Sequence, residues 1–239
     1  MPRLTVVPLD VLDPTAAVEL FAERFRAQGG SWDDGDEARD AESTAQVVKQ
    51  LDYLPLAIEL QAARAARGGM SVAHLNADLA RDRSQGLFGD PTDATKNLRY
   101  SFEQSLRTLT PLQRTRFAAL GLPGGPDWPR DVIMRLLAGI QEHTEQDATA
   151  TTDGTQETPE SDDEPSANAM ASTQADLDLL VALSLLTPAE GRLRLHPLLR
   201  EFAHEVWRAE PPATQIAGSP HCWRASLRWS EDTGAISPR

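Results

Sequence analysis

The residues best suited to chemistry lie in two short segments of this 239-residue chain. In one, His196 ends an alternating run and precedes Pro197 and a helix-period apolar pattern. An imidazole at such a junction can donate a hydrogen bond to a bound group, or it can cap the helix or face the solvent. In the other, Pro55 and Leu56 open the segment PLAIEL. A proline at a helix start is also common in helices without any binding role.

Sequence patterns of catalysis and metal binding are missing from the chain. The five histidines and the single Cys222 have no spacing typical of a metal site. No Gly-x-x-x-x-Gly-Lys-Ser/Thr loop, which would hold phosphates with backbone N–H groups and a lysine, occurs in the sequence. No nucleophile–base pair is readable either. We therefore expect no catalytic residues, no metal site and no enzymatic activity from this chain alone.

The composition favours a cytoplasmic location. A lone cysteine cannot form an internal disulfide. No apolar run approaches the roughly 18 residues that a membrane span requires, and the N-terminus lacks the apolar core of a signal peptide. We expect no membrane partner.

Much of the net charge of −13 comes from one segment, residues 141–173, which holds nine acidic residues and no Lys or Arg. The same segment contains no Val, Ile, Leu, Phe, Trp or Tyr. It cannot bury enough apolar surface to offset the entropy of ordering its backbone, about 1–2 kcal/mol per residue. We expect a disordered acidic insert, which is a tolerated surface insertion or, alternatively, a partner-binding segment.

The organisation of the chain predicts a mainly α-helical protein with two domains. Four short helices between residues 13 and 82, with Asp13 and Ser71 as N-caps, predict a small four-helix bundle. A polar linker follows at 83–94. Helices, a β-hairpin and a closing helix over 95–140 and 174–209 predict a winged-helix domain with one hairpin. The expected elements of this domain are helices over 95–107, 111–120, 127–140 and 176–183, a hairpin around Gly191, and a helix over 197–209. Residues 210–239 have no consistent period and are expected to be a disordered tail.

Four segments, in order, resemble motifs of the NB-ARC ATPases, the STAND-type signalling ATPases that include plant resistance proteins and the apoptotic protease activating factor. YLPLAIEL, starting at Tyr53, resembles their GLPLA motif, and LHPLLREFA around His196 resembles the bacterial form of their MHD motif. Between them, LTPLQRTRFAALGLPGG from Leu109 looks like the first winged-helix segment, and LDLLVALSLL from Leu177 looks like the family's LxxLxxxSLL helix.

The resemblance implies a regulatory C-terminal fragment of a bacterial AP-ATPase-like nucleotide switch that acts in signal transduction. Residues 1–12 would be a remnant of the nucleotide-binding domain. In the family, the proline of GLPLA packs near the adenine and the histidine of MHD contacts the β-phosphate of ADP. The implied nucleotide-binding residues are therefore Pro55, Leu56 and His196.

The parent family binds ADP or ATP, but no cofactor is expected for the isolated chain, because its phosphate loop is absent. The resemblance implies that nucleotide binds only together with the nucleotide-binding domain of a related or split protein, and that a protein effector is a further partner. Two motif positions also differ from the family pattern. Tyr53 replaces the glycine of GLPLA, and Pro197 replaces the aspartate of MHD, as bacterial members allow.

The alternative function is that of a winged-helix DNA-binding regulator. Such a fold reads bases with a helix that carries Arg, Lys, Asn or Gln. Here the equivalent helix is expected over 176–183, and residues 172–191 contain no Lys or Arg but include Asp176, Asp178 and Glu190. Because phosphates would repel this helix, nucleic acid is not an expected partner.

Overall fold

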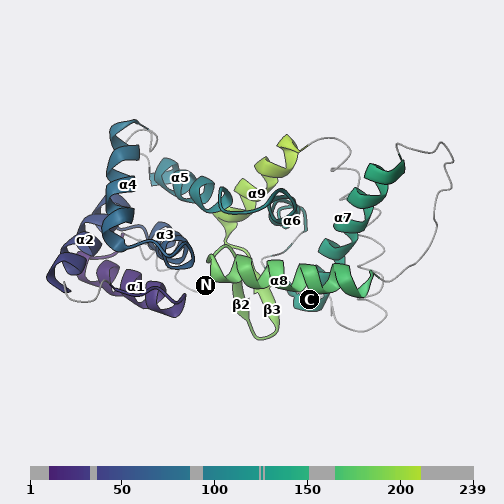
Figure 1. The fold of residues 1–239 in the computed structure, drawn as a ribbon, viewed down its shortest axis with the longest axis horizontal. Coiled ribbons are helices and arrows are strands. Elements are labelled where there is room, and N and C mark those ends of the chain that lie inside the picture. Colours follow the sequence, from purple (N-terminus) through teal and green to yellow (C-terminus); the bar gives the residue numbers. More distant parts are fainter. Residues whose placement is uncertain are drawn as a thin grey trace, which may run out of the picture. The chain divides into compact units, whose positions relative to one another are not determined.

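The computed structural model describes residues 11–32, 37–86, 94–123, 125, 127–150 and 165–210. Over these residues the protein is mainly helical, with nine α-helices and one small three-stranded antiparallel sheet (Figure 1). The chain divides into two compact units, Met1–Ser105 and Leu106–Arg239. Most of the expected N-terminal remnant, residues 1–10, and residues 211–239 of the expected tail lie outside the described residues.

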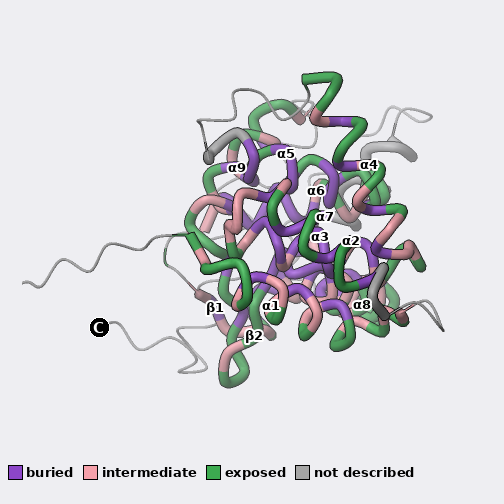
Figure 2. The backbone as a smooth tube through the Cα atoms, turned by 90° about the vertical axis from the view of Figure 1, so that its left-hand side faces the viewer, coloured by how far each residue is buried: buried purple, intermediate pink, exposed green. Residues whose placement is uncertain are grey.

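The first unit begins with four helices that agree with the expected ones. They are α1 (Pro14–Ala27), α2 (Glu37–Gln50), α3 (Pro55–Arg67) and α4 (Val72–Ser84). Helix α1 packs against α2 and α3, and α2 packs against α4. Along α1 and α4 the buried residues recur about once per helix turn, because one stripe of each helix faces the core, whereas α3 is buried along most of its length (Figure 2). The wholly buried side chains of this core include Phe21, Ile58, Leu60, Leu75 and Leu79.

The predicted N-caps of this unit are confirmed. The carboxylate of Asp13 accepts hydrogen bonds from the backbone N–H groups of Thr15 and Ala16, at 3.0 and 3.1 Å. The hydroxyl of Ser71 accepts one from the N–H of His74 at 3.3 Å. Each cap satisfies donors that the first helical turn leaves without an intrahelical acceptor.

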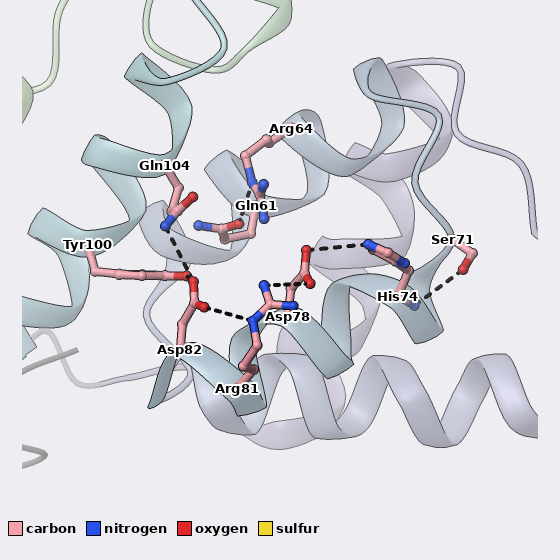
Figure 3. A network of polar contacts seen from close by, with 9 residues as sticks. All are labelled: Gln61, Arg64, Ser71, His74, Asp78, Arg81, Asp82, Tyr100 and Gln104. Carbon is pink, nitrogen blue, oxygen red and sulfur yellow. Dashed lines mark hydrogen bonds and ion pairs between the residues drawn. The ribbon is translucent and has the colours of Figure 1, made fainter. Parts of the chain in front are cut away.

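A fifth helix, α5 (Ala94–Leu106), belongs to the first unit up to Ser105. This differs from the prediction, which placed 95–107 in the second domain after the linker at 83–94. The physical reason is a set of buried polar contacts with α4. The hydroxyl of Tyr100 donates to Asp82 at 2.5 Å, and the amide of Gln104 approaches the same carboxylate at 3.5 Å (Figure 3).

The second unit combines four helices with the sheet in its described residues. Its elements are α6 (Pro111–Ala119), β1 (Asp127–Pro129), α7 (Arg130–Ala150), α8 (Ala167–Ala182), β2 (Thr187–Ala189), β3 (Arg192–Arg194) and α9 (Pro197–Ala209). The strand order is β1-β3-β2. Helix α7 packs against α8, and α6 packs against α9. The start of α6 is a capping box, in which Thr110 and Gln113 each bond the other's backbone N–H.

The predicted hairpin is confirmed, with strands of three residues each. Ala189 pairs with Arg192, so the turn consists of Glu190 and Gly191 alone. Both turn residues have positive φ, 46° and 77°. This is the requirement of the type I′ turn, whose twist matches that of the flanking strands.

Two predicted element bounds in this unit are wrong. Residues 127–129 form strand β1 instead of a helix start, because Trp128 pairs with Leu193 of β3. The expected disordered insert is also too long, since α7 continues to Ala150 and α8 begins at Ala167. Residues 151–164 of that insert lie outside the described residues.

Candidate functional site

The first predicted nucleotide-binding residue, His196, is the N-cap of α9. It follows β3 and is exposed. Its Nδ1 accepts a hydrogen bond from the N–H of Leu198 at 3.3 Å, and its carbonyl accepts one from the N–H of Arg200 at 2.9 Å. Because Nδ1 is an acceptor, the neutral ring carries its proton on Nε2. The imidazole of His196 therefore caps the start of α9 through Nδ1.

Three arginines lie near His196 in the sequence, and each has a protein partner. Arg192 and Arg194 on β3 pair with the carboxylate of Asp127 on β1, at 2.6 and 3.6 Å. The hydrogen bond from Arg192, with the positive charge of both guanidinium groups, holds the pKa of Asp127 below its ordinary value. Arg200 donates to the carbonyl of Gly125 at 2.8 Å. Arg192 and Arg194 therefore link β3 to β1, and Arg200 links the first turn of α9 to Gly125.

The other two predicted residues occupy the first turn of α3. Pro55 is the first helical residue and is exposed, and Leu56 is half-buried. The preceding residue, Leu54, has no side chain that could cap the helix. The start of α3 therefore depends on the backbone of the turn that precedes it. Pro55 and Leu56 lie together in the first unit, whereas His196 lies in the second.

The turn before Pro55 contains a feature that residue patterns alone did not reveal. Asp52 and Tyr53 both have left-handed backbone, with φ of 52° and 55°. The N–H of Tyr53 donates to the carbonyl of Val48 at 3.0 Å, and its carbonyl accepts from the N–H of Leu12 at 3.1 Å. Glycine adopts this conformation without a steric penalty from a Cβ. Glycine at position 53 would therefore adopt this backbone more easily than Tyr53 does.

The carboxylates on α8 have different surroundings. Asp176 is buried and accepts hydrogen bonds from Arg116 and from the amide of Gln113. Asp178 is exposed and pairs with Arg130. Of the carboxylates expected to repel DNA, Asp176 is therefore paired with Arg116 inside the unit and does not face a ligand.

Metal-ligating residues do not gather in the described part of the chain, where no group of three or more His, Cys, Asp or Glu side chains could hold an ion. Within the same ranges, no helix has both the length and the apolar character that crossing a bilayer requires. No family model matches the chain, and no curated protein matches it.

Proposed function

We propose that this chain is the regulatory part of an NB-ARC/STAND-type nucleotide switch, comprising its helical subdomain and its winged-helix subdomain. The observation that carries the proposal is the order of four motif-like segments along the sequence, from YLPLAIEL at Tyr53 to LHPLLREFA at His196. The described helices α3, α6, α8 and α9 each begin in, overlap or contain one of these segments.

The winged-helix assignment of the second unit is supported by its topology. The elements α6, β1, α7, α8, β2 and β3 follow one another in the order helix, strand, helix, helix, hairpin. The last strand lies between the other two in the sheet. The tight Glu190–Gly191 turn gives this hairpin the form of a wing. We assign the helical-subdomain role to α1–α4, with α5 attached to them.

In the proposed switch, His196 donates from Nε2 to a phosphate oxygen of ADP, and a charge-assisted hydrogen bond of this kind is about twice as strong as a neutral one. Its Nδ1 is already engaged by Leu198, which orients the ring. Pro55 and Leu56 supply apolar contact for the adenine at the start of α3. Exchange of ADP for ATP would remove the His196 contact and so bias a two-state equilibrium.

In this proposal the chain alone neither hydrolyses ATP nor holds nucleotide firmly, since the sequence contains no phosphate loop. A cytoplasmic signalling role with a protein effector fits it best. DNA binding is less favoured, because the exposed positions of α8 carry no cation: they are Ala167, Asn168, Ala171, Ala175 and Asp178. A helix without Lys or Arg lacks the phosphate contacts that dominate DNA affinity.

Calorimetry with the purified full chain tests this proposal. Titration of ADP should give no measurable binding heat, and incubation with ATP and Mg²⁺ should release no phosphate above the buffer rate. Steady turnover by the pure chain would contradict the proposal, because hydrolysis would then need no second domain. Tight binding to a DNA duplex would favour the alternative function instead.

A further inference from the structure

The link between α2 and α3 holds two consecutive non-glycine residues in left-handed backbone, Asp52 and Tyr53. This conformation is unfavourable for residues with a Cβ, less so for Asp than for a bulky residue such as Tyr. Helix α2 ends in a Schellman-type pattern, in which Tyr53 N–H bonds the carbonyl of Val48 and Asp52 N–H bonds that of Lys49. That pattern accounts for the left-handed backbone of Asp52, and Tyr53 follows as a second left-handed residue, whose carbonyl accepts from the N–H of Leu12 at 3.1 Å.

Contacts from α4 and α5 hold Asp52 in place. Asn97 of α5, which is wholly buried, donates through Nδ2 to the Asp52 carboxylate. Arg83 of α4 lies 3.6 Å from the same carboxylate and also donates to the carbonyl of Gln50. Strained backbone persists where its surroundings over-determine it, and it is concentrated at functional sites and switch regions.

The Asp52–Tyr53 turn adjoins Pro55, and helix α5 adjoins the second unit. Directly after the strained turn, Leu54 starts α3: its carbonyl accepts from the N–H of Ile58 at 3.0 Å, and Pro55 follows as the first helical residue. At the other end, α5 runs without interruption to Leu106, the first residue of the second unit. Helix α5 is therefore joined covalently to the unit that carries His196, and by a part-buried hydrogen bond to the turn before Pro55.

We propose that α5 couples the second unit to the Pro55 end of α3. While α5 is docked, Asn97 holds the Asp52–Tyr53 turn in its strained form and sets the position of Pro55 and Leu56. When α5 shifts, the turn relaxes and the start of α3 moves with it. This regulation rests on the proposed function only in taking Pro55 and Leu56 as the nucleotide contact.

Hydrogen–deuterium exchange on the full chain without nucleotide tests the coupling. We expect Asn97→Ala to speed exchange of the backbone amides of residues 53–58 by about fivefold, the effect of losing one hydrogen bond of about 1 kcal/mol. Arg99→Ala is the matched control, because its side chain lies on the same helix and is 52% exposed. Arg99→Ala should leave the exchange rates of residues 53–58 unchanged. The amides of α1 should exchange at wild-type rates in both variants.

Tyr53→Gly, alone and combined with Asn97→Ala, distinguishes an effect of backbone strain at Tyr53 from a simple loss of packing at Asn97. Tyr53→Gly removes the steric cost of the left-handed backbone, so the turn should keep its form without help from α5. In this background Asn97→Ala should change the exchange of residues 53–58 by less than about twofold. If Asn97→Ala prevents folding, Asn97→Ser serves in the same cycle, because it keeps a small polar side chain.

Two results would overturn the coupling: equal exchange at residues 53–58 in wild type and Asn97→Ala, or an equal effect of Asn97→Ala with Tyr53 and with Gly at position 53. Neither result depends on nucleotide. Conversely, a failure of Pro55 and His196 to hold ADP in a complete switch would overturn the proposed function and leave these exchange results as they are.

Discussion

The wholly buried guanidinium of Arg116 on α6 is paired with the carboxylate of Asp176 on α8. The same guanidinium donates to the hydroxyl of Ser172 at 3.2 Å. Gln113, a member of the α6 capping box, donates to the other Asp176 oxygen at 2.9 Å. This network joins two helices that are about 60 residues apart in the sequence and fixes α8 against α6.

Loss of either side chain of the Arg116–Asp176 ion pair should therefore destabilise the protein. We expect Arg116→Ala and Asp176→Ala each to lower the free energy of unfolding by about 3–5 kcal/mol, because each leaves an uncompensated buried charge. The double variant Arg116→Met/Asp176→Leu should recover most of the loss. Asp178→Ala, at the exposed Arg130 pair, is the control and should cost no more than about 1 kcal/mol. Urea denaturation measures all four, and equal costs at Asp176 and Asp178 would contradict the burial of the pair.

The close approach of α9 to the end of α6 gives a second prediction. A Cβ added at Gly121 would lie 2.6 Å from the backbone nitrogen of His204 and 2.9 Å from its Cα. Because backbone atoms cannot move aside cheaply, Gly121→Ala should destabilise the protein by about 1–3 kcal/mol. Gly139→Ala on α7 is the matched control, since its Cβ would meet nothing within 4 Å. That change should be neutral or stabilising by up to about 1 kcal/mol, and thermal unfolding distinguishes the two outcomes.

The hydroxyl of Tyr100 gives a third prediction. It donates to the buried carboxylate of Asp82, so Tyr100→Phe should lower the free energy of unfolding by about 1–2 kcal/mol. The other tyrosine of the chain supplies the control, because no hydrogen bond from the Tyr53 hydroxyl occurs within the described ranges. Tyr53→Phe should change stability by less than about 0.5 kcal/mol. Equal effects of the two substitutions in urea denaturation would mean that the Asp82 bond contributes nothing.

The pairing of Asp127 with β3 predicts a pH dependence at the sheet. Arg192 and Arg194 lower the pKa of Asp127 from its ordinary value of 3.8. A carboxyl whose folded pKa is depressed adds stability that is fully present above the unfolded pKa and is lost as the pH falls through the folded pKa. The stability difference between wild type and Asp127→Asn should therefore be constant above about pH 5, shrink as the pH falls below 3.8, and level off only below the lowered folded pKa of Asp127.

An NMR titration of the Asp127 carboxyl carbon checks the cause of this shift. In Arg192→Ala the pKa of Asp127 should move back towards its ordinary value, because the largest contribution comes from the Arg192 hydrogen bond. Glu201→Ala, an exposed change elsewhere in the same unit, should leave the titration as it is. An unaltered pKa in Arg192→Ala would show that the ion pair does not hold in solution.

Local signals in the sequence predicted where most helices begin. Asp13 before Pro14 and Ser71 were expected as N-caps, and in both cases the side-chain oxygen accepts a backbone N–H. The hairpin could be predicted because a Gly-containing turn separates two short alternating runs, although its first strand lies at Thr187–Ala189, largely within the expected loop. These features depend on neighbours within a few residues, which a sequence displays directly.

Strand β1 and the start of α8 were not predicted. The strand depends on a pairing partner far along the chain, and the start of α8 has high helix propensity but no periodic apolar pattern. Strand β1 has three residues and exists through pairing with β3, 65 residues away. Helix α8 begins in an Ala-rich stretch with no large aliphatic residue until Leu177, apart from Met170. The high helix propensity of alanine was the signal that could have revealed it. At the candidate site, the motif positions located Pro55 and His196, whereas the burial of Asn97 beside the Asp52–Tyr53 turn required the fold.

In the proposed function, residues 11–210 supply the regulatory part of an ADP-holding switch, and His196 contacts the nucleotide directly. The most direct test places this segment in an intact NB-ARC protein that copurifies with ADP, in exchange for the corresponding segment. The ADP content per folded chimera is then measured for wild type, His196→Ala and the control His74→Ala, whose exposed imidazole lies on α4 beside Asp78. We predict about one ADP per chimera with wild type and His74→Ala, and loss of most of it with His196→Ala. A folded chimera that holds no ADP, or one that holds ADP equally well with His196→Ala, would contradict the account.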